Sequence, residues 1–188
     1  MRIVSGVLGG RKLLSPPAEV RPTQDRVRQI LFDIIGPTVA EGPLLDLYAG
    51  SGAMGLEGLS RGATALTAVE LARPVRVVLE RNLAALEAEA EVLGLAVHLA
   101  LPRLLREGRA FRWIVADPPY GGRETVWLLG WLGGEGAALL DQPGNLAVET
   151  ARDEQMPDES GRLRRYRVRE VGGTALHFYA IRQEDERR

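Results

Sequence analysis

The stretch from Leu44 to Gly55 constrains the fold more than any other part of the chain. It reads Leu-Leu-Asp-Leu-Tyr-Ala-Gly-Ser-Gly-Ala-Met-Gly, which is typical of a short buried strand, a glycine-rich turn and the first turn of a helix. Glycine tolerates positive φ and has no Cβ, so the backbone N–H groups of such a turn can approach a ligand closely. The sequence therefore predicts a cofactor-binding turn at the end of a strand.

The glycine spacing alone leaves the cofactor open. Gly50, Gly52 and Gly55 satisfy G-x-G-x-x-G, and Glu70 lies about 20 residues further on, where a dinucleotide-binding unit has a ribose-binding acid. Both a nicotinamide-dependent dehydrogenase and an S-adenosylmethionine (SAM) methyltransferase use a βαβ unit with an acid at the end of its second strand. The pattern does not separate these two classes.

An acid on the first strand favours the methyltransferase. Asp46 lies four residues before Gly50, where a site that must accept a pyrophosphate would gain nothing from a negative charge. A carboxylate there suits a cationic ligand such as a sulfonium. The alternative interpretation is that Asp46 is a structural carboxylate that caps the glycine turn.

A second feature is the tetrapeptide Asp117-Pro118-Pro119-Tyr120, which follows the apolar run 113–116. It therefore falls at the carboxyl end of a strand, where α/β proteins bind ligands. Two prolines hold the backbone extended and leave carbonyl groups free to accept hydrogen bonds. The exocyclic amine of a base could donate to the Asp117 carboxylate and the Pro118 carbonyl, and an extruded base could stack on Tyr120 for roughly 1 to 3 kcal/mol. The alternative is that Pro-Pro-Tyr only ends a strand.

The remaining apolar patterns alternate between helix and strand. An alternation of this kind predicts a mostly parallel, doubly wound sheet, and the pair Gly172-Gly173 predicts an antiparallel hairpin at its carboxyl-terminal edge. We expect a basic arm or hairpin over residues 1–22, one domain over 23–183 and a charged tail over 184–188. The expected helices cover 23–35, 53–61, 74 to about 94, 101–107 and 124–132, and the expected strands cover 44–47, 65–70, 95–99, 113–116, 146–149, 164–170 and 174–181.

Composition excludes several classes of protein. The chain has no cysteine and two histidines far apart in sequence, so thiolate chemistry is excluded and no metal centre is expected. No apolar run approaches the roughly 20 residues that span a bilayer, and the amino terminus does not resemble a signal peptide, so we expect a cytoplasmic protein.

The net charge gives no sign of nucleic-acid binding, but the type and position of the basic residues do. The formal net charge is -1, but Lys12 is the only lysine among 24 basic residues, and arginine pairs bidentately with phosphate and stacks on bases. A GC-rich genome or heat adaptation would explain the same bias. The expected RNA-binding residues lie in the arm, on the helix that begins at Thr23 and near the carboxyl-terminal hairpin: Arg2, Arg11, Lys12, Arg21, Arg26, Arg28, Arg164 and Arg165.

Taken together, these segments resemble the RsmD family, bacterial 16S rRNA guanine-N2 methyltransferases that modify the guanine numbered 966. The resemblance runs through most of the chain. It is carried by Arg21-Pro22-Thr23 with Asp25-Arg26-Val27-Arg28 and Leu31-Phe32, by residues 45–52 with Gly55-Leu56-Glu57 and Ser60-Arg61-Gly62-Ala63, by Val69-Glu70 and by Asp117-Pro118-Pro119-Tyr120. The last pattern alone is less specific, because adenine-N6 and glutamine-N5 methyltransferases share it.

The resemblance implies a Rossmann-like SAM-dependent methyltransferase fold and a target base held by Asp117, Pro118, Pro119 and Tyr120. Such enzymes often have a polar pair after the third strand, whereas this chain has Leu99-Ala100-Leu101-Pro102, so adenine would be held there by apolar and backbone groups. The residues expected to bind SAM are Thr23, Asp46, Tyr48, Ala49, Gly50, Ser51, Gly52, Glu70, Leu71, Ala100, Leu101 and Asp117.

The partner implied is 16S rRNA, within the small ribosomal subunit or an assembly intermediate, bound by a monomer with no metal and no membrane. Three alternatives stay open: an adenine-N6 DNA or RNA methyltransferase, a nicotinamide-dependent dehydrogenase and a non-catalytic RNA-binding protein. The chain has no segment large enough for a separate DNA target-recognition domain, which disfavours the DNA enzyme.

Overall fold

The computed structural model describes residues 1–15, 25–119 and 122–182, and these residues build one eight-stranded sheet. The strand order is β3-β2-β1-β4-β5-β8-β7-β6. The first five are parallel, and β8, β7 and β6 are antiparallel additions at one edge. The strands are β1 (Leu44–Leu47), β2 (Leu66–Val69), β3 (Glu91–Leu93), β4 (Phe111–Ala116), β5 (Leu140–Ala151), β6 (Glu159–Ser160), β7 (Leu163–Val171) and β8 (Thr174–Ile181).

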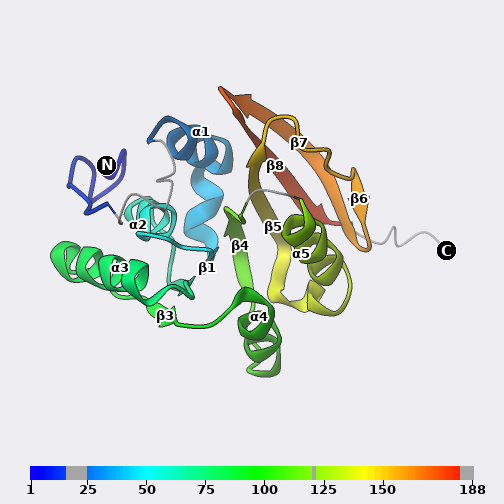
Figure 1. Cartoon of the computed structure of the whole chain (residues 1–188), viewed down its shortest axis with the longest axis horizontal. Helices are drawn as coiled ribbons and strands as arrows, with labels where there is room; N and C mark the ends of the chain where they lie inside the picture. The colour runs from blue at the N-terminus through cyan, green and yellow to red at the C-terminus, as the bar shows by residue number, and fades with distance from the viewer. Residues whose placement is uncertain (16–24, 120–121, 183–188) are drawn as a thin grey trace.

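Helices cover both faces of the sheet, as Figure 1 shows. One apolar cluster joins α4 and α5 to one face, which we call the α5 face. Two further clusters join α1, α2, α3 and the amino-terminal arm to the other, which we call the α1 face. The helical segments are α1 (Asp25–Ile35), α2 (Ala53–Ser60), α3 (Arg73–Leu86), α4 (Val97–Arg106), α5 (Arg123–Gly133) and the 3-10 turns η1 (Gly36–Glu41) and η2 (Glu135–Leu139).

Side-chain alternation assigns residues of the central strands to these two faces. Leu45 and Leu47 of β1 belong to the α5-face cluster, whereas Leu44 belongs to the α1-face clusters, so Asp46 points toward the α1 face. The same alternation places Ala116 of β4 on the α5 face and the residue after it toward the α1 face. Doubly wound packing of this kind confirms the fold class that the sequence predicts.

The boundaries of three consecutive elements, α3, β3 and α4, were predicted wrongly. Residues 95–99 were expected to form the third strand, but that strand is β3 at Glu91–Leu93, and α4 already begins at Val97. The helix α3 accordingly ends at Leu86 rather than near Gly94. The buried positions of α4 are Val97, Ala100, Leu101 and Leu104, which is the spacing of one helical face. The segment 95–99 was thus mistaken for a strand, because the helical spacing of buried residues becomes visible only when positions beyond residue 99 are included.

The carboxyl-terminal hairpin was predicted correctly. β7 and β8 pair antiparallel around Gly172, whose φ of 61° lies in the region that favours glycine. β8 also pairs antiparallel with β5, which is longer than expected. The hairpin therefore extends the parallel sheet beyond β5, at the edge farthest from α3 in Figure 1.

Candidate functional site

The glycine turn lies at the carboxyl end of β1 and leads into α2. Gly52 has a φ of 82°, and a Cβ there would lie 2.2 Å from Cδ1 of Leu79 on α3, so this position requires glycine. Among the residues that the structure describes, a Cβ on Gly50 would meet only the carbonyl oxygen of Tyr48, at 3.9 Å. The turn is therefore packed tightly against α3 at Gly52 but faces open space at Gly50, where a ligand can approach the backbone.

Glu70 holds this turn from the end of β2. One carboxylate oxygen accepts a hydrogen bond from the backbone N–H of Gly50 at 3.0 Å, and the other accepts from the N–H of Ala72 at 2.7 Å. Each carboxylate oxygen has a second lone pair and can still accept a hydroxyl. Glu70 is thus a structural member of the turn, and its contact with a ribose stays a prediction.

Asp46 is buried beneath the turn and caps α2. Its carboxylate accepts the N–H of Gly55 at 2.8 Å, and the residue is 2% exposed. Burial raises the pKa of Asp46 to about 7, the hydrogen bond from Gly55 opposes this rise, and the charges of Asp117 and Glu70 add to it. The capping interpretation therefore accounts for what Asp46 does in this structure, and a role toward a cation stays a prediction.

Tyr48 links the turn to α5. Its φ of 61° is uncommon for a residue with a side chain, and its hydroxyl donates to Glu124 at 3.0 Å. Burial and the contact with Glu124 raise the pKa of Tyr48, so it remains a neutral hydrogen-bond donor. Because α5 follows the Asp-Pro-Pro-Tyr segment, this bond ties the two halves of the candidate site together.

Asp117 lies directly beside the turn. Strands β1 and β4 pair in parallel with Leu47 opposite Ala116, and the backbone N–H of Asp117 reaches the carbonyl oxygen of Leu47 at 3.5 Å. Pro118 is buried, whereas Pro119 is exposed. The glycine turn and the Asp-Pro-Pro segment thus occupy adjoining strand ends.

Sequence reasoning missed Glu149 of β5. Glu149 is 5% exposed. Val148 of β5 lies opposite Ala116 of β4, so the next residues along the two strands, Glu149 and Asp117, lie at the same level of the sheet. Burial raises the pKa of Glu149 to about 8, the charge of Asp117 adds to this rise, and a hydrogen bond from Thr174 opposes it. One carboxylate oxygen of Glu149 has no hydrogen-bond partner. The sequence did contain a signal for Glu149, because an acid that directly follows the apolar run 146–148 stands at the carboxyl end of a strand.

Two predicted cofactor contacts stay predictions, and burial argues against a side-chain contact at either residue. Ala100 and Leu101 are both fully buried in the core of the α5 face, on the second turn of α4, so their side chains cannot reach a ligand. The residues that actually follow β3 are Gly94, Leu95 and Ala96. Leu71, also expected at the cofactor, follows Glu70 and is 62% exposed.

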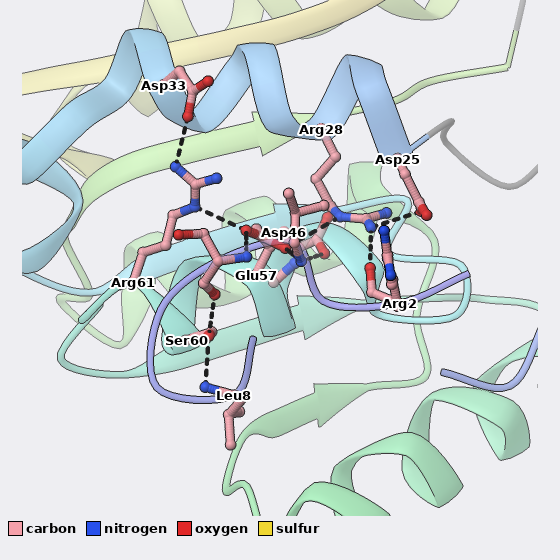
Figure 2. A network of polar contacts seen from close by, with 12 residues as sticks. Arg2, Leu8, Asp25, Arg28, Asp33, Asp46, Glu57, Ser60 and Arg61 are labelled. Atoms are coloured by element: carbon pink, nitrogen blue, oxygen red, sulfur yellow. Dashed lines mark hydrogen bonds and ion pairs between the residues drawn. The ribbon is translucent and has the colours of Figure 1, made fainter. Parts of the chain in front are cut away.

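Arg28 is a further correction, because it does not project into solvent. Its side chain is fully buried and bonds to Asp25 at 2.8 Å, to the carbonyl oxygen of Arg2 and to Glu57 at 3.5 Å. Figure 2 shows this guanidinium enclosed between α1, α2 and the arm. Arg28 therefore joins the arm to the domain, and its guanidinium is not exposed toward a ligand in this structure.

Glu57 is the centre of that network. It is fully buried on α2 and accepts the backbone N–H groups of Val4 and Ser5 at 2.7 and 3.0 Å, besides the guanidinium of Arg61 at 2.8 Å. Ser60, one turn later, binds the arm through the N–H of Leu8 (Figure 2). The described part of the arm, residues 1–15, is closed by an antiparallel bridge between Arg2 and Lys12, and its contacts with Glu57 and Ser60 anchor it to α2.

The other predicted RNA-binding residues differ in exposure. Arg2, Arg11, Lys12 and Arg26 are exposed, although Arg11 also donates to the carbonyl oxygen of Ala85 at 2.7 Å. Arg164 is exposed and lies 4.0 Å from Glu159, whereas Arg165 is half-buried. Arg165 bonds to Asp158, to the Met156 carbonyl at 3.0 Å and to His177 at 3.2 Å, so it is engaged within the fold. Arg21, Thr23 and Tyr120 lie outside the described residues.

Neither a metal site nor a membrane-spanning helix is found among the described residues. Within residues 1–15, 25–119 and 122–182, no three His, Asp or Glu side chains are grouped so that they could hold a metal ion. In the same ranges, every helix is too short or too polar to cross a bilayer.

Comparison with known proteins decides the family. The family model described as conserved hypothetical protein 95 matches residues 1–180. Ribosomal RNA small subunit methyltransferase D of Escherichia coli strain K12 is 35% identical over 194 residues, which cover 99% of this chain and 92% of that protein. The chain belongs to the RsmD family.

Solved structures agree with this RsmD-family assignment. The Escherichia coli protein yhhF, named as a methyltransferase, is 33% identical with a TM-score of 0.82 and covers 96% of this chain and 97% of that one. A hypothetical protein of Thermus thermophilus is 29% identical with a TM-score of 0.79, covering 95% and 98%. The family and the methyltransferase fold, both predicted from the sequence, are confirmed.

Proposed function

We propose that this protein is a SAM-dependent methyltransferase that modifies the exocyclic N2 amine of a guanine in 16S rRNA. The observation that carries the proposal is the pairing of β1 with β4, which brings the glycine turn and Asp117 to adjoining strand ends. Transfer of a methyl group to an amine requires the donor and the acceptor nitrogen to lie side by side, and adjoining strand ends can hold them so. The relative named as a small-subunit rRNA methyltransferase supports this substrate.

The turn fits SAM better than a dinucleotide. Nothing described packs closely on Gly50, and the Asp46 carboxylate beneath the turn would repel a pyrophosphate but suit a sulfonium. SAM supplies an electrophilic methyl group when bound. The backbone groups of 48–52 and the carboxylate of Glu70 would hold it over the turn.

The Asp-Pro-Pro-Tyr segment would hold the target base. Asp117 accepts a hydrogen bond from the guanine N2 amine and orients its lone pair toward the methyl donor. As the nitrogen bonds to the methyl carbon, the bond from that carbon to the sulfonium sulfur would break and a neutral thioether would leave. The nitrogen would then lose a proton, which the same carboxylate would accept. Tyr120 is proposed to stack on the base. Action as a monomer in the cytoplasm, on rRNA within the small subunit or its assembly intermediates, belongs to the same proposal.

The test is product analysis. Purified protein is incubated with SAM and either naked 16S rRNA or small subunits from a strain that lacks the corresponding methyltransferase, and the nucleosides are separated by mass spectrometry. We expect N2-methylguanosine, and its loss with Asp117→Ala. If N6-methyladenosine is found instead, the protein is an adenine-N6 methyltransferase. Calorimetric binding of NAD but not SAM would refute the methyltransferase proposal.

A further inference from the structure

Strand β7 contains an irregularity that changes which of its side chains lie on each face. Arg165 is opposite Tyr179, whereas Arg167 is opposite Phe178, so Tyr166 is an extra residue in β7. Before it, Leu163 packs in the α5-face cluster; after it, Val171 packs against the α1-face cluster. Odd-numbered residues therefore change from the α5 face to the α1 face at Tyr166.

The bulge turns two arginines toward the α1 face. Arg167 lies opposite Phe178, and Arg169 lies opposite Leu176, both of which belong to the α1-face cluster. Both arginines are exposed. Among the described residues neither forms an ion pair, whereas the neighbouring Arg164 and Arg165 are paired with Glu159 and Asp158. The two guanidinium groups are thus available to an external anion.

An exposed aromatic ring accompanies them. Tyr166 is 52% exposed, and its ring centroid lies 6.2 Å from that of Phe178. The charge of Arg167 acts on the phenol, opposing the rise in the pKa of Tyr166 that burial causes. One side of the ring is therefore supported by Phe178, and a cation lies nearby.

This surface lies two strands away from Glu149 of the candidate site. Arg169 is opposite Leu176 of β8, and Leu176 is opposite Glu149 of β5, which is level with Asp117. Two strand spacings separate Arg169 from Glu149, or about 10 Å. Arg167 is two residues further from that end of the sheet, or about 7 Å along the strand. A row of cations thus leads away from the catalytic end on the face toward which Asp117 points.

We propose that Tyr166, Arg167 and Arg169 form a docking surface for the RNA strand that flanks the target guanine. Arginine forks bind phosphate bidentately, and a supported tyrosine ring stacks on an unpaired base without sequence preference. The combination fits a single-stranded nucleic acid better than an acidic polypeptide, which has no bases to stack. The inference rests on the proposed function for the identity of the RNA, and it moves the binding role from Arg165 to Arg167 and Arg169.

The test compares two double variants of equal charge. R167Q/R169Q removes the proposed surface, and R103Q/R106Q removes two exposed arginines from the last turn of α4, on the opposite face. RNA affinity is measured by fluorescence anisotropy with a labelled single-stranded rRNA fragment over a salt series. We expect the slope of log K against log salt to become shallower by about 1.4 in the first variant only, since each phosphate contact on a single strand contributes about 0.7. Equal slopes in both variants would overturn the proposal.

Two further measurements separate this proposal from others. Y166A should weaken RNA binding by roughly 5- to 150-fold and Y166F should not, because stacking needs the ring but not the hydroxyl. SAM binding should be unchanged in all variants. If R167Q/R169Q shows the shallower salt dependence but the parent protein makes no methylguanosine, the proposed function is refuted and the RNA-docking surface still stands. Polyglutamate that binds as tightly as RNA, and loses affinity in the same variants, would show that the surface recognises acidic chains instead.

Discussion

Replacing Glu57 by alanine should destabilise the protein strongly, because this carboxylate neutralises a buried guanidinium. Arg28 is fully buried and would keep only Asp25, whose side chain is 44% exposed, as a counter-charge. Breaking a buried ion pair by removing one partner costs about 3 to 5 kcal/mol. The N–H groups of Val4 and Ser5 lose their acceptor as well, but they are partly buried and can bind water instead. We therefore expect a loss of about 3 to 5 kcal/mol from the Arg28 pair alone.

That loss should appear in both chemical and thermal unfolding. For a domain of this size each kcal/mol lowers Tm by about 2 to 4 °C, so Glu57→Ala should lower it by roughly 6 to 20 °C. Urea unfolding followed by circular dichroism gives the free energy directly. The matched control is Asp33→Ala, which removes the exposed partner of Arg61 in the same network and should cost at most about 1 kcal/mol.

A double variant checks the physical cause. Adding Arg28→Met to Glu57→Ala removes the unpaired buried charge and should recover part of the lost stability, because an apolar side chain of similar length can fill the same space. Two results would contradict this explanation: a loss of unfolding free energy in Glu57→Ala no larger than that in Asp33→Ala, or a double variant less stable than Glu57→Ala alone. Either would show that the unpaired charge of Arg28 is not the cause of the destabilisation.

Four shorter predictions concern the site. Glu70→Ala should weaken SAM binding by roughly 1.5 to 3 kcal/mol in calorimetry, the value of hydrogen bonds to a charged group, and unchanged affinity would remove Glu70 from the cofactor site. Asp117→Ala should lose turnover far more than SAM affinity, and parallel loss of both would place Asp117 on the cofactor instead. The folded-state pKa of Glu149 is raised to about 8, so the native protein binds a proton more tightly than the unfolded chain, and stability should fall as pH rises between about 4.5 and 8. Glu149→Gln should therefore be more stable than the parent at pH 9 but not at pH 4, as measured by urea unfolding, and parallel pH profiles would contradict this. Reversing Arg11 and Lys12 to glutamate should flatten the salt dependence of RNA binding by about one unit of slope per lost phosphate contact, and an unchanged slope would show that the arm does not bind RNA.

The parts of the fold that the sequence predicts well are those fixed by neighbours in the chain. The turn after β1 is determined by Gly50 and Gly52, and the β7–β8 hairpin by Gly172 and the residue after it, because local backbone conformation decides both. The boundary at Val97 was predicted wrongly because the short, mostly apolar segment 95–99 fits a strand as well as a helix, and only its packing against the sheet separates the two.

The burial of Arg28 and the placement of Glu149 could not be predicted for a different reason. Arg28 meets Glu57 only after α1 has packed across α2, and Glu149 meets Asp117 only through the register of β4 with β5. Neither relation is visible as a spacing along the chain. The same applies to Arg167, whose face depends on a single extra residue in β7.

The strand order also determines when the chain can fold during its synthesis. β1 lies between β2 and β4, so one of its edges stays unpaired until residue 116 has been made, and the α1-face cluster is incomplete without Phe178 of β8. Long-range pairing of this kind delays cooperative folding until most of the chain exists. We therefore expect a nascent chain ending before β8 to expose the apolar surface of α1 and β5 and to be prone to aggregation.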